Sequence, residues 1–327
     1  MERFKILTHP VHPAWEWEFS KLNVFLYSIR PDNFSFLNST NWITAYWTMI
    51  GDLEWNVRQR PLPKNIKFVD LNEVNKLIKE KKIDFLLVHT FLWLEKLQDI
   101  AKVVPTILHL HTLDSEYFKI PEKIKSSLVA VTANSSLHFR NFNFNGIKKV
   151  IPVPVDTNFF SGYIGDIKRC LVVYNFFNLR AEEIFKDYLQ ELRKKLPIDI
   201  IDPDTKNGLG EAISRNELLF FYRHWAVFLN LSSYLSMSLL EAMSVGMPVI
   251  LFESENIKKG MKGKFFIDGV NCLIVSDIKD ALEKINILFK DKNLRSKIGI
   301  NARESVIKFY NVEKFLSEWN SLFNELK

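Results

Sequence analysis

Short apolar runs alternate with stretches of helical periodicity along the whole sequence, and this alternation constrains the fold more than any other feature. Six continuous runs in the first half are rich in strand-forming residues and lack a two-residue alternation of apolar and polar positions: 4–7, 66–70, 83–89, 106–111, 128–133 and 149–153. Continuous runs of this length are typical of strands buried on both faces of a sheet. Apolar residues at helical spacing fill the stretches between them, at 73–82, 93–102 and 135–142. The first half therefore predicts a doubly wound α/β domain with a parallel sheet.

The same pattern restarts after residue 160. Five further runs predict buried strands at 169–175, 197–202, 226–232, 247–253 and 271–277. Helical periodicity occurs at 180–195, at 236–246 and throughout 292–327. The second half is thus predicted to be another doubly wound domain.

A domain boundary is predicted near residues 154–168, where prolines and glycines punctuate a segment without helical period. At 327 residues the chain also exceeds the roughly 250 to 300 residues at which one core stops growing. We predict an N-terminal domain of residues 1–155, completed by a C-terminal helix at 310–327, and a C-terminal domain of residues 156–309. Two such domains create a cleft beyond the carboxyl ends of their strands, and this cleft is the predicted site.

Composition excludes several classes of protein. Hydrophobic residues make up 47% of the chain and charged residues 25%, which excludes disordered and collagen-like sequences. The two cysteines, Cys170 and Cys272, are too few for a disulfide scaffold or a multi-cysteine zinc site and suit a reducing compartment. No apolar run approaches the roughly 18 to 20 residues that span a bilayer, and the N-terminus lacks a signal-peptide core. We expect a cytoplasmic protein.

The net charge of +6 comes mainly from the first half of the chain. Its lysines are scattered rather than clustered, as at Lys76, Lys79 and Lys82, so a solvated surface explains them. Peripheral association with an anionic membrane stays open. No zinc-finger spacing, RNP-like motif or basic zipper is present, and we predict no nucleic-acid partner.

Residues 228–252 are the most informative segment, because they predict a strand, a loop, a helix ending at a glycine, and another strand. Ser236 or Ser238 can cap the start of this helix, where free backbone N–H groups attract a phosphate. Glu241 lies in the first turns among apolar neighbours. Its carboxylate either accepts a hydrogen bond from a ligand hydroxyl or only complements the helix dipole, and the local sequence favours neither.

This segment resembles a known enzyme family. The string SLLEAMSVGMPVI at 238–250, followed by IDGVNCLIVSD at 267–277, is similar to the signature of the large retaining glycosyltransferase family called group 1. Further matches follow in order along the chain, at 105–111, 131–136, 148–160 and 216–230. The resemblance implies the GT-B fold, in which two doubly wound Rossmann-like domains face each other across a cleft. It also implies an acceptor-side N-terminal domain and a C-terminal domain that binds a nucleotide sugar.

The resemblance assigns donor contacts to two glutamates eight positions apart. Glu241 matches the second, which usually holds the ribose, but Ser233 stands where the first would contact the transferred sugar. A serine can form hydrogen bonds, yet it adds no negative charge beside a developing oxocarbenium ion. Three alternatives follow: the sugar is held differently, the donor is unusual, or activity is reduced.

The resemblance also implies roles for several other residues. His111, at the carboxyl end of a predicted strand, matches a histidine near the transferred sugar, with a core histidine such as His109 as the alternative. Arg180 and Lys186 match loosely the two cations that neutralise the diphosphate, or they lie on an exposed helix face. The helix N-terminus would contact the diphosphate through Ser236, Met237, Ser238 and Leu239.

The segment 9–21, HPVHPAWEWEFSK, is predicted to be a loop after the first strand. Four of its side chains are candidates for binding an acceptor: His9, His12, Trp15 and Glu16. Tryptophan rings stack on sugar faces and carboxylates accept from sugar hydroxyls, although aromatic packing between domains is the alternative. His9, His12 and Glu16 also suggest a metal site, but this spacing is weakly specific and the family transfers sugars without bound metal, so no metal is predicted.

Together these features predict a retaining, metal-independent glycosyltransferase. It would move a sugar from a nucleoside diphosphate sugar, its co-substrate, to an acceptor hydroxyl, with no permanently bound cofactor. The acceptor is left open between a glycan, a lipid-linked molecule and a small molecule. The alternatives are a degenerate GT-B protein that binds nucleotide or sugar without turnover, and an unrelated two-domain enzyme such as a sugar-nucleotide epimerase or a phosphorylase.

Overall fold

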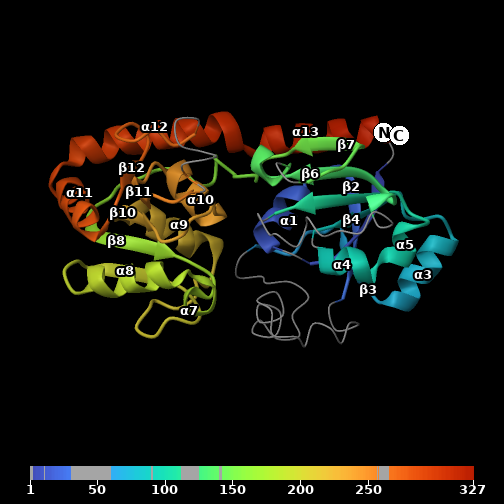
Figure 1. Cartoon of the computed structure of the whole chain (residues 1–327), viewed down its shortest axis with the longest axis horizontal. Coiled ribbons are helices and arrows are strands. Elements are labelled where there is room, and N and C mark those ends of the chain that lie inside the picture. Colours follow the sequence, from blue (N-terminus) through green and yellow to red (C-terminus); the bar gives the residue numbers. More distant parts are fainter. Residues whose placement is uncertain are drawn as a thin grey trace. The chain divides into compact units, whose positions relative to one another are not determined.

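The chain forms two compact units, each built on one parallel sheet (Figure 1). Unit 1 comprises Met1–Pro154 with Glu313–Lys327, and unit 2 comprises Val155–Val312. The computed structural model describes residues 3–10, 12–30, 60–89, 91–111, 125–139, 142–255, 257 and 265–327.

The sheet of unit 1 has seven strands in the order β3-β2-β1-β4-β5-β6-β7. They are β1 (Phe4–Thr8), β2 (Val24–Ile29), β3 (Ile66–Val69), β4 (Phe85–Val88), β5 (Thr106–Leu110), β6 (Leu128–Ala133) and β7 (Ile147–Val150). The central strands β4 and β5 are buried at every position, in keeping with their continuous apolar sequence. Strand β2 was not predicted. It lies beside the edge strand β3, and its residues alternate in part between buried and half-buried positions.

Helices cover both faces of this sheet. They are α1 (Pro13–Phe19), α3 (Leu71–Lys79), α4 (Phe91–Lys96), α5 (Gln98–Ala101), the 3-10 helix η4 (Ser136–Phe139) and α13 (Val312–Glu325). Leu86 packs with side chains of α3 and α4, whereas its neighbour Phe85 points to the other face and stacks on Phe323 of α13. The single helix expected at 93–102 is two short helices. The helix expected at 135–142 is only one 3-10 turn, with residues 140 and 141 outside the described part.

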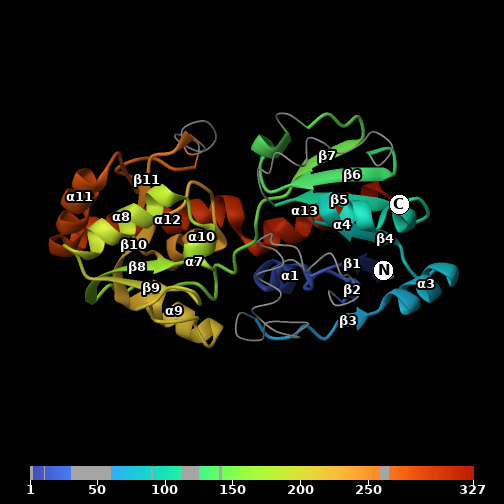
Figure 2. The ribbon, with the colours of Figure 1, turned by 60° about the horizontal axis from the view of Figure 1, so that its bottom comes forward.

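The loop expected at 9–21 is wrong, because residues 13–19 form helix α1. Pro13 occupies the first turn, where its missing N–H costs no hydrogen bond. The backbone N–H of His12 donates to the Glu16 carboxylate at 2.9 Å and closes the helix start. Trp15 packs edge-on against Trp319 of α13, so elements from opposite ends of the chain share one aromatic core. Figure 2 shows α13 alongside the strands of unit 1.

The sheet of unit 2 has five parallel strands in the order β12-β11-β10-β8-β9. They are β8 (Ile167–Val173), β9 (Ile198–Ile201), β10 (Trp225–Asn230), β11 (Val249–Phe252) and β12 (Leu273–Val275), and each overlaps one of the five predicted runs. Val227 and Leu229 face the cluster formed with α8 and α11. Phe228 lies between them in sequence and contacts Tyr222 of α9 instead. Helices thus cover both faces here as well.

The helices of unit 2 are α7 (Phe177–Arg180), α8 (Glu183–Arg193), α9 (Arg215–His224), α10 (Met237–Val245), α11 (Ile278–Lys290) and α12 (Lys292–Tyr310). The continuous helix expected at 292–327 is interrupted at Asn311, which has an extended backbone with φ −67° and ψ 153°. The interruption has a physical cause, since the backbone of Val155 pairs with Asn311 and donates to the carbonyl of Tyr310 at 2.8 Å.

Two glycines allow α10 and α12 to touch backbone to backbone. Gly246 ends α10 in the left-handed region, with φ 94°. Gly299 on α12 lies so close that a Cβ atom there would stand 1.8 Å from the carbonyl oxygen of Gly246. Because the obstructing atom belongs to the backbone, the two helices would have to separate to accommodate a side chain.

We expect Gly299→Ala to lower the free energy of unfolding by about 1–3 kcal/mol, because the overpacking outweighs the better helix propensity of alanine. Urea denaturation of the full chain measures this change. Lys297→Ala, at an exposed position of the same helix, is the matched control and should change stability by less than about 0.5 kcal/mol. A Gly299→Ala protein as stable as wild type would contradict the close backbone contact.

Candidate functional site

In unit 2, the N-terminus of α10 lies against the carboxyl end of β8. The Ser236 hydroxyl accepts from the backbone N–H of Leu239 at 3.1 Å, so Ser236 is the helix cap. The hydroxyl of Ser238 instead donates to the carbonyl of Val173 at 3.3 Å and joins the helix to the strand end. The N–H groups of Met237 and Ser238 have no carbonyl partner within the helix, and they make its start suitable for an anion.

Glu241 is a buried, hydrogen-bonded carboxylate. Its side chain lies on α10 with 4% of the residue exposed, and the Tyr222 hydroxyl of α9 donates to Oε2 at 3.4 Å. A charge that only complemented the helix dipole would stay solvated at the surface, because burial of a carboxylate is costly without partners. The environment of Glu241 therefore favours a specific hydrogen-bonding role.

Ser233 follows β10 and lines a pocket of about 360 Å³. Its hydroxyl donates to the carboxylate of Glu182, the residue that precedes α8. Glu253 and Glu255 line the same pocket, together with Phe252 and other aromatic side chains. A carboxylate thus lies one hydrogen bond from position 233, although it comes from a different element. Glu182 was not predicted from the sequence, because only the fold brings residues 182 and 233 together.

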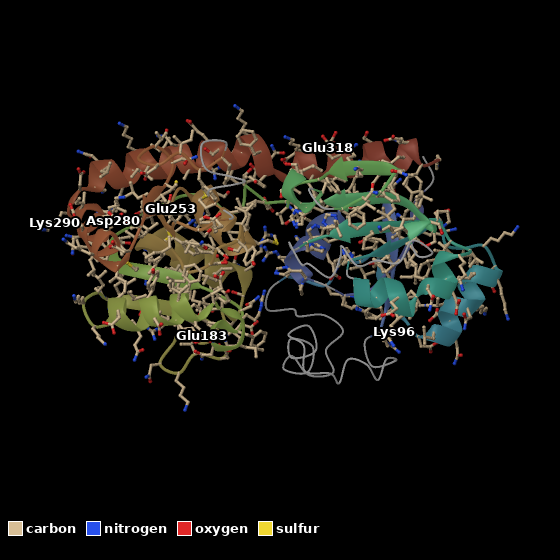
Figure 3. The ribbon with its side chains drawn as sticks, viewed as in Figure 1. Lys96, Glu183, Glu253, Asp280, Lys290 and Glu318 are labelled. Carbon is tan, nitrogen blue, oxygen red and sulfur yellow. The ribbon has the colours of Figure 1, made fainter. Side chains whose placement is uncertain are left out.

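The two cations predicted to bind a diphosphate have different surroundings. Arg180 ends α7, is exposed and donates to the carbonyl of Asn175 at 3.1 Å. Lys186 forms an ion pair of 2.6 Å with Glu183 of its own helix, α8. Glu183 lies at the surface of unit 2 (Figure 3). Such exposed pairs within one helix contribute little stability and exchange partners readily. Lys186 can therefore leave Glu183 for a more strongly charged anion.

A pair of aspartates at the end of β9 was likewise not predicted from the sequence. Asp202 is buried and accepts from the backbone N–H of Phe177 at 3.1 Å, while Asp204 accepts from that of Asn178 at 3.2 Å. Burial, and then the nearby Asp204, raise the pKa of Asp202 to about 7. The predicted strand 197–202 ends in Asp202. A carboxylate at the carboxyl end of a strand was the sequence feature that could have indicated a site residue here.

In unit 1, histidines gather at the carboxyl edge of the sheet. His9 follows β1, His89 follows β4, and His111 follows β5. The Nδ1 atom of His89 lies 2.9 Å from Nε2 of His111, and its backbone N–H donates to Nε2 of His9 at 3.1 Å. The structure therefore joins two predicted site residues, His9 and His111, through a third that was missed. The signal was present, since the predicted strand 83–89 ends in His89.

Both ring nitrogens of His9 are already used. Nε2 accepts from the backbone of His89, and Nδ1 therefore carries the proton and donates to the carbonyl of Pro10 at 3.1 Å. The ring is buried and stacks on Trp93 with a centroid distance of 4.3 Å. Burial lowers the pKa of His9 to about 3. These contacts make His9 a poor metal ligand. Within the described residues, no group of three or more His, Cys, Asp or Glu side chains is arranged to hold a metal ion.

The candidate acceptor residues of α1 lie mostly inside unit 1. Trp15 is 1% exposed and packs edge-on against His89 and His111. The alternative to sugar stacking was aromatic packing between domains. Trp15 does pack against aromatic side chains, but they belong to α13 of the same unit. Glu16 is buried and closes the start of α1, whereas His12 is partly exposed.

His109, which the sequence left open as a core histidine, is a buried histidine with both ring nitrogens paired. Its Nδ1 atom lies 2.7 Å from the Thr132 hydroxyl, and its Nε2 atom lies 3.1 Å from Oδ1 of Asn134. The Asn134 amide donates to the carbonyl of His111, which fixes its oxygen toward His109. His109 therefore carries its proton on Nε2, and burial lowers its pKa to about 3.

A family model described as glycosyl transferase-like matches residues 180–321, which is less than half of the chain. The match begins at the end of α7 and runs through α8 to α12 into α13. No curated protein sequence matches the chain.

Solved structures resemble the chain over nearly its whole length. HepE of Anabaena, in complex with UDP-glucose, is 13% identical with a TM-score of 0.66, covering 99% of this chain and 100% of that one. Sucrose-phosphate synthase of Thermosynechococcus elongatus is 14% identical with a TM-score of 0.65, covering 99% of both chains. A glycosyltransferase of Rickettsia africae is 11% identical with a TM-score of 0.63, again covering 99% of both. The chain has the GT-B fold of these neighbours, as the sequence predicted.

Among the described residues, no helix is both long and apolar enough to cross a membrane.

The neutral, buried state of His109 makes stability depend on pH. Its pKa is lower in the folded chain than the ordinary 6.5 of an unfolded one, so the unfolded state gains the proton first as the pH falls. Stability is therefore full above about pH 6.5 and falls below it, by about 2 kcal/mol for this residue between pH 7 and pH 5.

We expect the stability loss between pH 7 and pH 5 to be about 2 kcal/mol smaller in His109→Gln than in wild type. Urea denaturation at both pH values measures the difference, and comparison with wild type cancels the titration of all other groups. Equal losses in the two proteins would show that His109 is not held neutral in the fold.

Proposed function

We propose that the chain is a retaining glycosyltransferase that moves a sugar from a nucleoside diphosphate sugar to an acceptor hydroxyl. The observation that carries this proposal is the glycosyl transferase-like match over 180–321, which includes α10 with its Ser236 cap and buried Glu241. The GT-B fold over nearly the whole length supports it. Unit 2 binds the donor, and unit 1 with the C-terminal helix forms the acceptor side.

The donor diphosphate binds at the start of α10. The backbone N–H groups of Met237 and Ser238 contact its oxygens, and the helix dipole adds to the attraction. Arg180 offers a planar guanidinium for bidentate contact, and Lys186 adds a point charge once it leaves Glu183. Glu241 accepts a hydrogen bond from a ribose hydroxyl, a contact for which a buried carboxylate already oriented by Tyr222 is suited.

The reaction proceeds with retention and without a protein nucleophile. The acceptor oxygen forms its bond to the anomeric carbon on the face from which the diphosphate leaves, and a diphosphate oxygen takes the acceptor's proton. The protein contributes positioning and stabilisation of charge, with the α10 N-terminus at the leaving diphosphate and His111 at the sugar. The cations and amides at the diphosphate make a bound metal ion unnecessary in this scheme, and no permanent cofactor takes part.

The acceptor is a hydroxyl of a glycan, a lipid-linked molecule or a small molecule. Cys170 and Cys272 are buried and unpaired, which supports the expected cytoplasmic location. The basic excess of the first half permits peripheral association with an anionic membrane surface, but charge alone does not choose among these acceptors.

Nucleotide binding tests the donor assignment. UDP is the first candidate among UDP, GDP, ADP, CDP and dTDP, because HepE was solved with UDP and glucose. A nucleotide at 100 times its dissociation constant should stabilise the chain by about 2.7 kcal/mol, with or without magnesium, in a thermal shift experiment.

Glu241→Gln should lower the affinity for the stabilising nucleotide about tenfold, because the amide accepts more weakly from the ribose while keeping the side-chain volume. Calorimetric titration measures the affinity. Glu304→Gln, an exposed carboxylate on α12, is the control and should bind as wild type does. Unchanged affinity in Glu241→Gln would contradict the ribose contact.

The second candidate is a protein that binds nucleotide or sugar without turnover, which the serine at position 233 favours. The hydrogen bond from Ser233 to Glu182 argues for activity, because it places a carboxylate beside the position of the missing glutamate. This carboxylate can stabilise positive charge developing on the transferred sugar.

Glu182→Gln should therefore lower kcat for transfer about 10- to 100-fold and leave nucleotide affinity within about twofold. Release of UDP from UDP-glucose in the presence of acceptors measures turnover. Asp187→Asn, at an exposed position of the helix that follows Glu182, is the matched control. Tight nucleotide binding without turnover of any sugar nucleotide by wild type would favour the binding-only alternative.

A further inference from the structure

His89 and His111 form a two-imidazole pair at the carboxyl ends of neighbouring strands. Strands β4 and β5 run parallel and in register, with Val88 opposite Leu108, so the residues that follow them meet at one edge of the sheet. The Nδ1 atom of His89 and the Nε2 atom of His111 are 2.9 Å apart. At this distance the two nitrogens form a hydrogen bond, in which one carries the proton and donates and the other accepts the hydrogen bond.

The remaining contacts of His89 indicate which nitrogen carries that proton. Its Nε2 atom lies 3.3 Å from the hydroxyl of Thr8, and this hydroxyl donates to the carbonyl of His9. A threonine hydroxyl has a single proton, so it accepts from Nε2–H of His89. The Nδ1 atom of His89 is then the acceptor, and His111 carries its proton on Nε2. Nδ1 of His111 is left with an unprotonated lone pair.

The two rings differ in their access to a ligand. His89 is 1% exposed and both of its ring nitrogens are engaged. His111 is only partly buried, and within the described part of the chain its Nδ1 atom has no hydrogen-bond partner and is not among the buried polar atoms. Within the described part of the chain, Nδ1 of His111 is therefore the ring nitrogen of the pair that is open to a ligand.

The surrounding packing holds both rings in place. Trp15 contacts the pair edge-on, with centroid distances of 5.0 Å to His89 and 5.3 Å to His111. Asn134 donates to the carbonyl of His111 at 3.2 Å and fixes the backbone that carries the ring. The backbone N–H of His89 is held by His9. The geometry of the pair is thus set before any ligand binds.

We propose that His89 is a positioning residue that fixes the orientation and tautomer of His111, so that Nδ1 of His111 accepts a hydrogen bond from a substrate hydroxyl. This inference rests on the proposed function for the identity of that hydroxyl, which belongs to the transferred sugar or to the acceptor. The part of the inference that concerns how His89 orients His111 does not depend on the proposed function. A protonated or rotated His111 would present a donor where the hydroxyl needs an acceptor.

The tautomer of His111 can be observed directly. Long-range proton–nitrogen correlation spectra of the full chain, labelled with nitrogen-15 histidine, distinguish protonated from unprotonated ring nitrogens. At pH 7.5, His111 should carry its proton on Nε2 in wild type. In His89→Leu, residue 89 cannot accept a hydrogen bond, so both tautomers of His111 should be populated. His89→Asn keeps an acceptor near the position of Nδ1 and should restore the wild-type tautomer. His109, with its proton on Nε2, serves as an internal reference for intact folding.

Thr8→Val provides a milder second variant, in case replacement of His89 impairs folding. Without the hydroxyl, Nε2 of His89 loses its acceptor, and the proton order along the pair is no longer enforced. Both tautomers of His111 should then be populated. A wild-type tautomer of His111 in both His89→Leu and Thr8→Val would overturn the proposal.

Turnover gives the second readout. With UDP-glucose as the probe, His89→Leu should lower kcat about 10- to 100-fold, and His89→Asn should remain within about threefold of wild type. His109→Gln is the matched control, because it is an equally buried histidine whose nitrogens face Thr132 and Asn134. It should change kcat by less than about threefold. Equal losses in His89→Leu, His89→Asn and His109→Gln would reduce His89 to a structural role and overturn the proposal.

The two readouts separate this proposal from the proposed function. Suppose that the variants show the expected tautomer changes but the wild-type chain releases UDP from no sugar nucleotide. This result would support His89 as a positioning residue and count against the transferase. Turnover with an unchanged tautomer in His89→Leu and Thr8→Val would support the transferase and overturn the role of His89.

Discussion

Burial of the parallel strands on both faces is the constraint on which the rest of this structure depends. Apolar strands such as β4, β5 and β10 exclude water from both sides, so helices must cover each sheet and polar chemistry is confined to the strand ends. The carboxyl edges gather His89 and His111 in unit 1 and Asp202 in unit 2. His89 and His111 are 22 positions apart in sequence and become neighbours because the parallel strands that precede them end at the same edge of one sheet.

Aromatic packing beside the carboxyl edge of unit 1 sets the protonation of its histidines. Trp15 and Trp93 contact the histidine rings and exclude water, which disfavours the charged imidazolium. Apart from Nδ1 of His111, the ring nitrogens of these histidines are paired with one another or with neighbouring backbone and side-chain groups. A buried polar network of this kind is rigid when every member is paired, and its cost is a fold that weakens in acid. In unit 2 burial raises a pKa instead of lowering it, because it favours the protonated, neutral form of Asp202.

Much of the fold could be predicted from local patterns, because those patterns report burial. All five strands of unit 2, the glycine that ends α10 and a serine cap at its start follow from apolar runs and capping chemistry. Strand β2 escaped prediction because a strand near a sheet edge is only partly buried. Helix α1 escaped because it is short, and because the partner that buries its aromatic residues, α13, lies at the other end of the chain.

The sequence by itself determined the doubly wound α/β class, the start of α10 and the resemblance that pointed to the GT-B fold, since each depends on residues close together along the chain. Only the tertiary structure decided which side chains share a site. The carboxylate of Glu182 reaches Ser233, and His89 connects His9 with His111, through contacts between residues that 22 to 80 positions separate. Periodicity reveals whether a residue is buried, but hydrogen-bond partners depend on which strand ends the sheet order brings together. That order is set by packing of the whole unit.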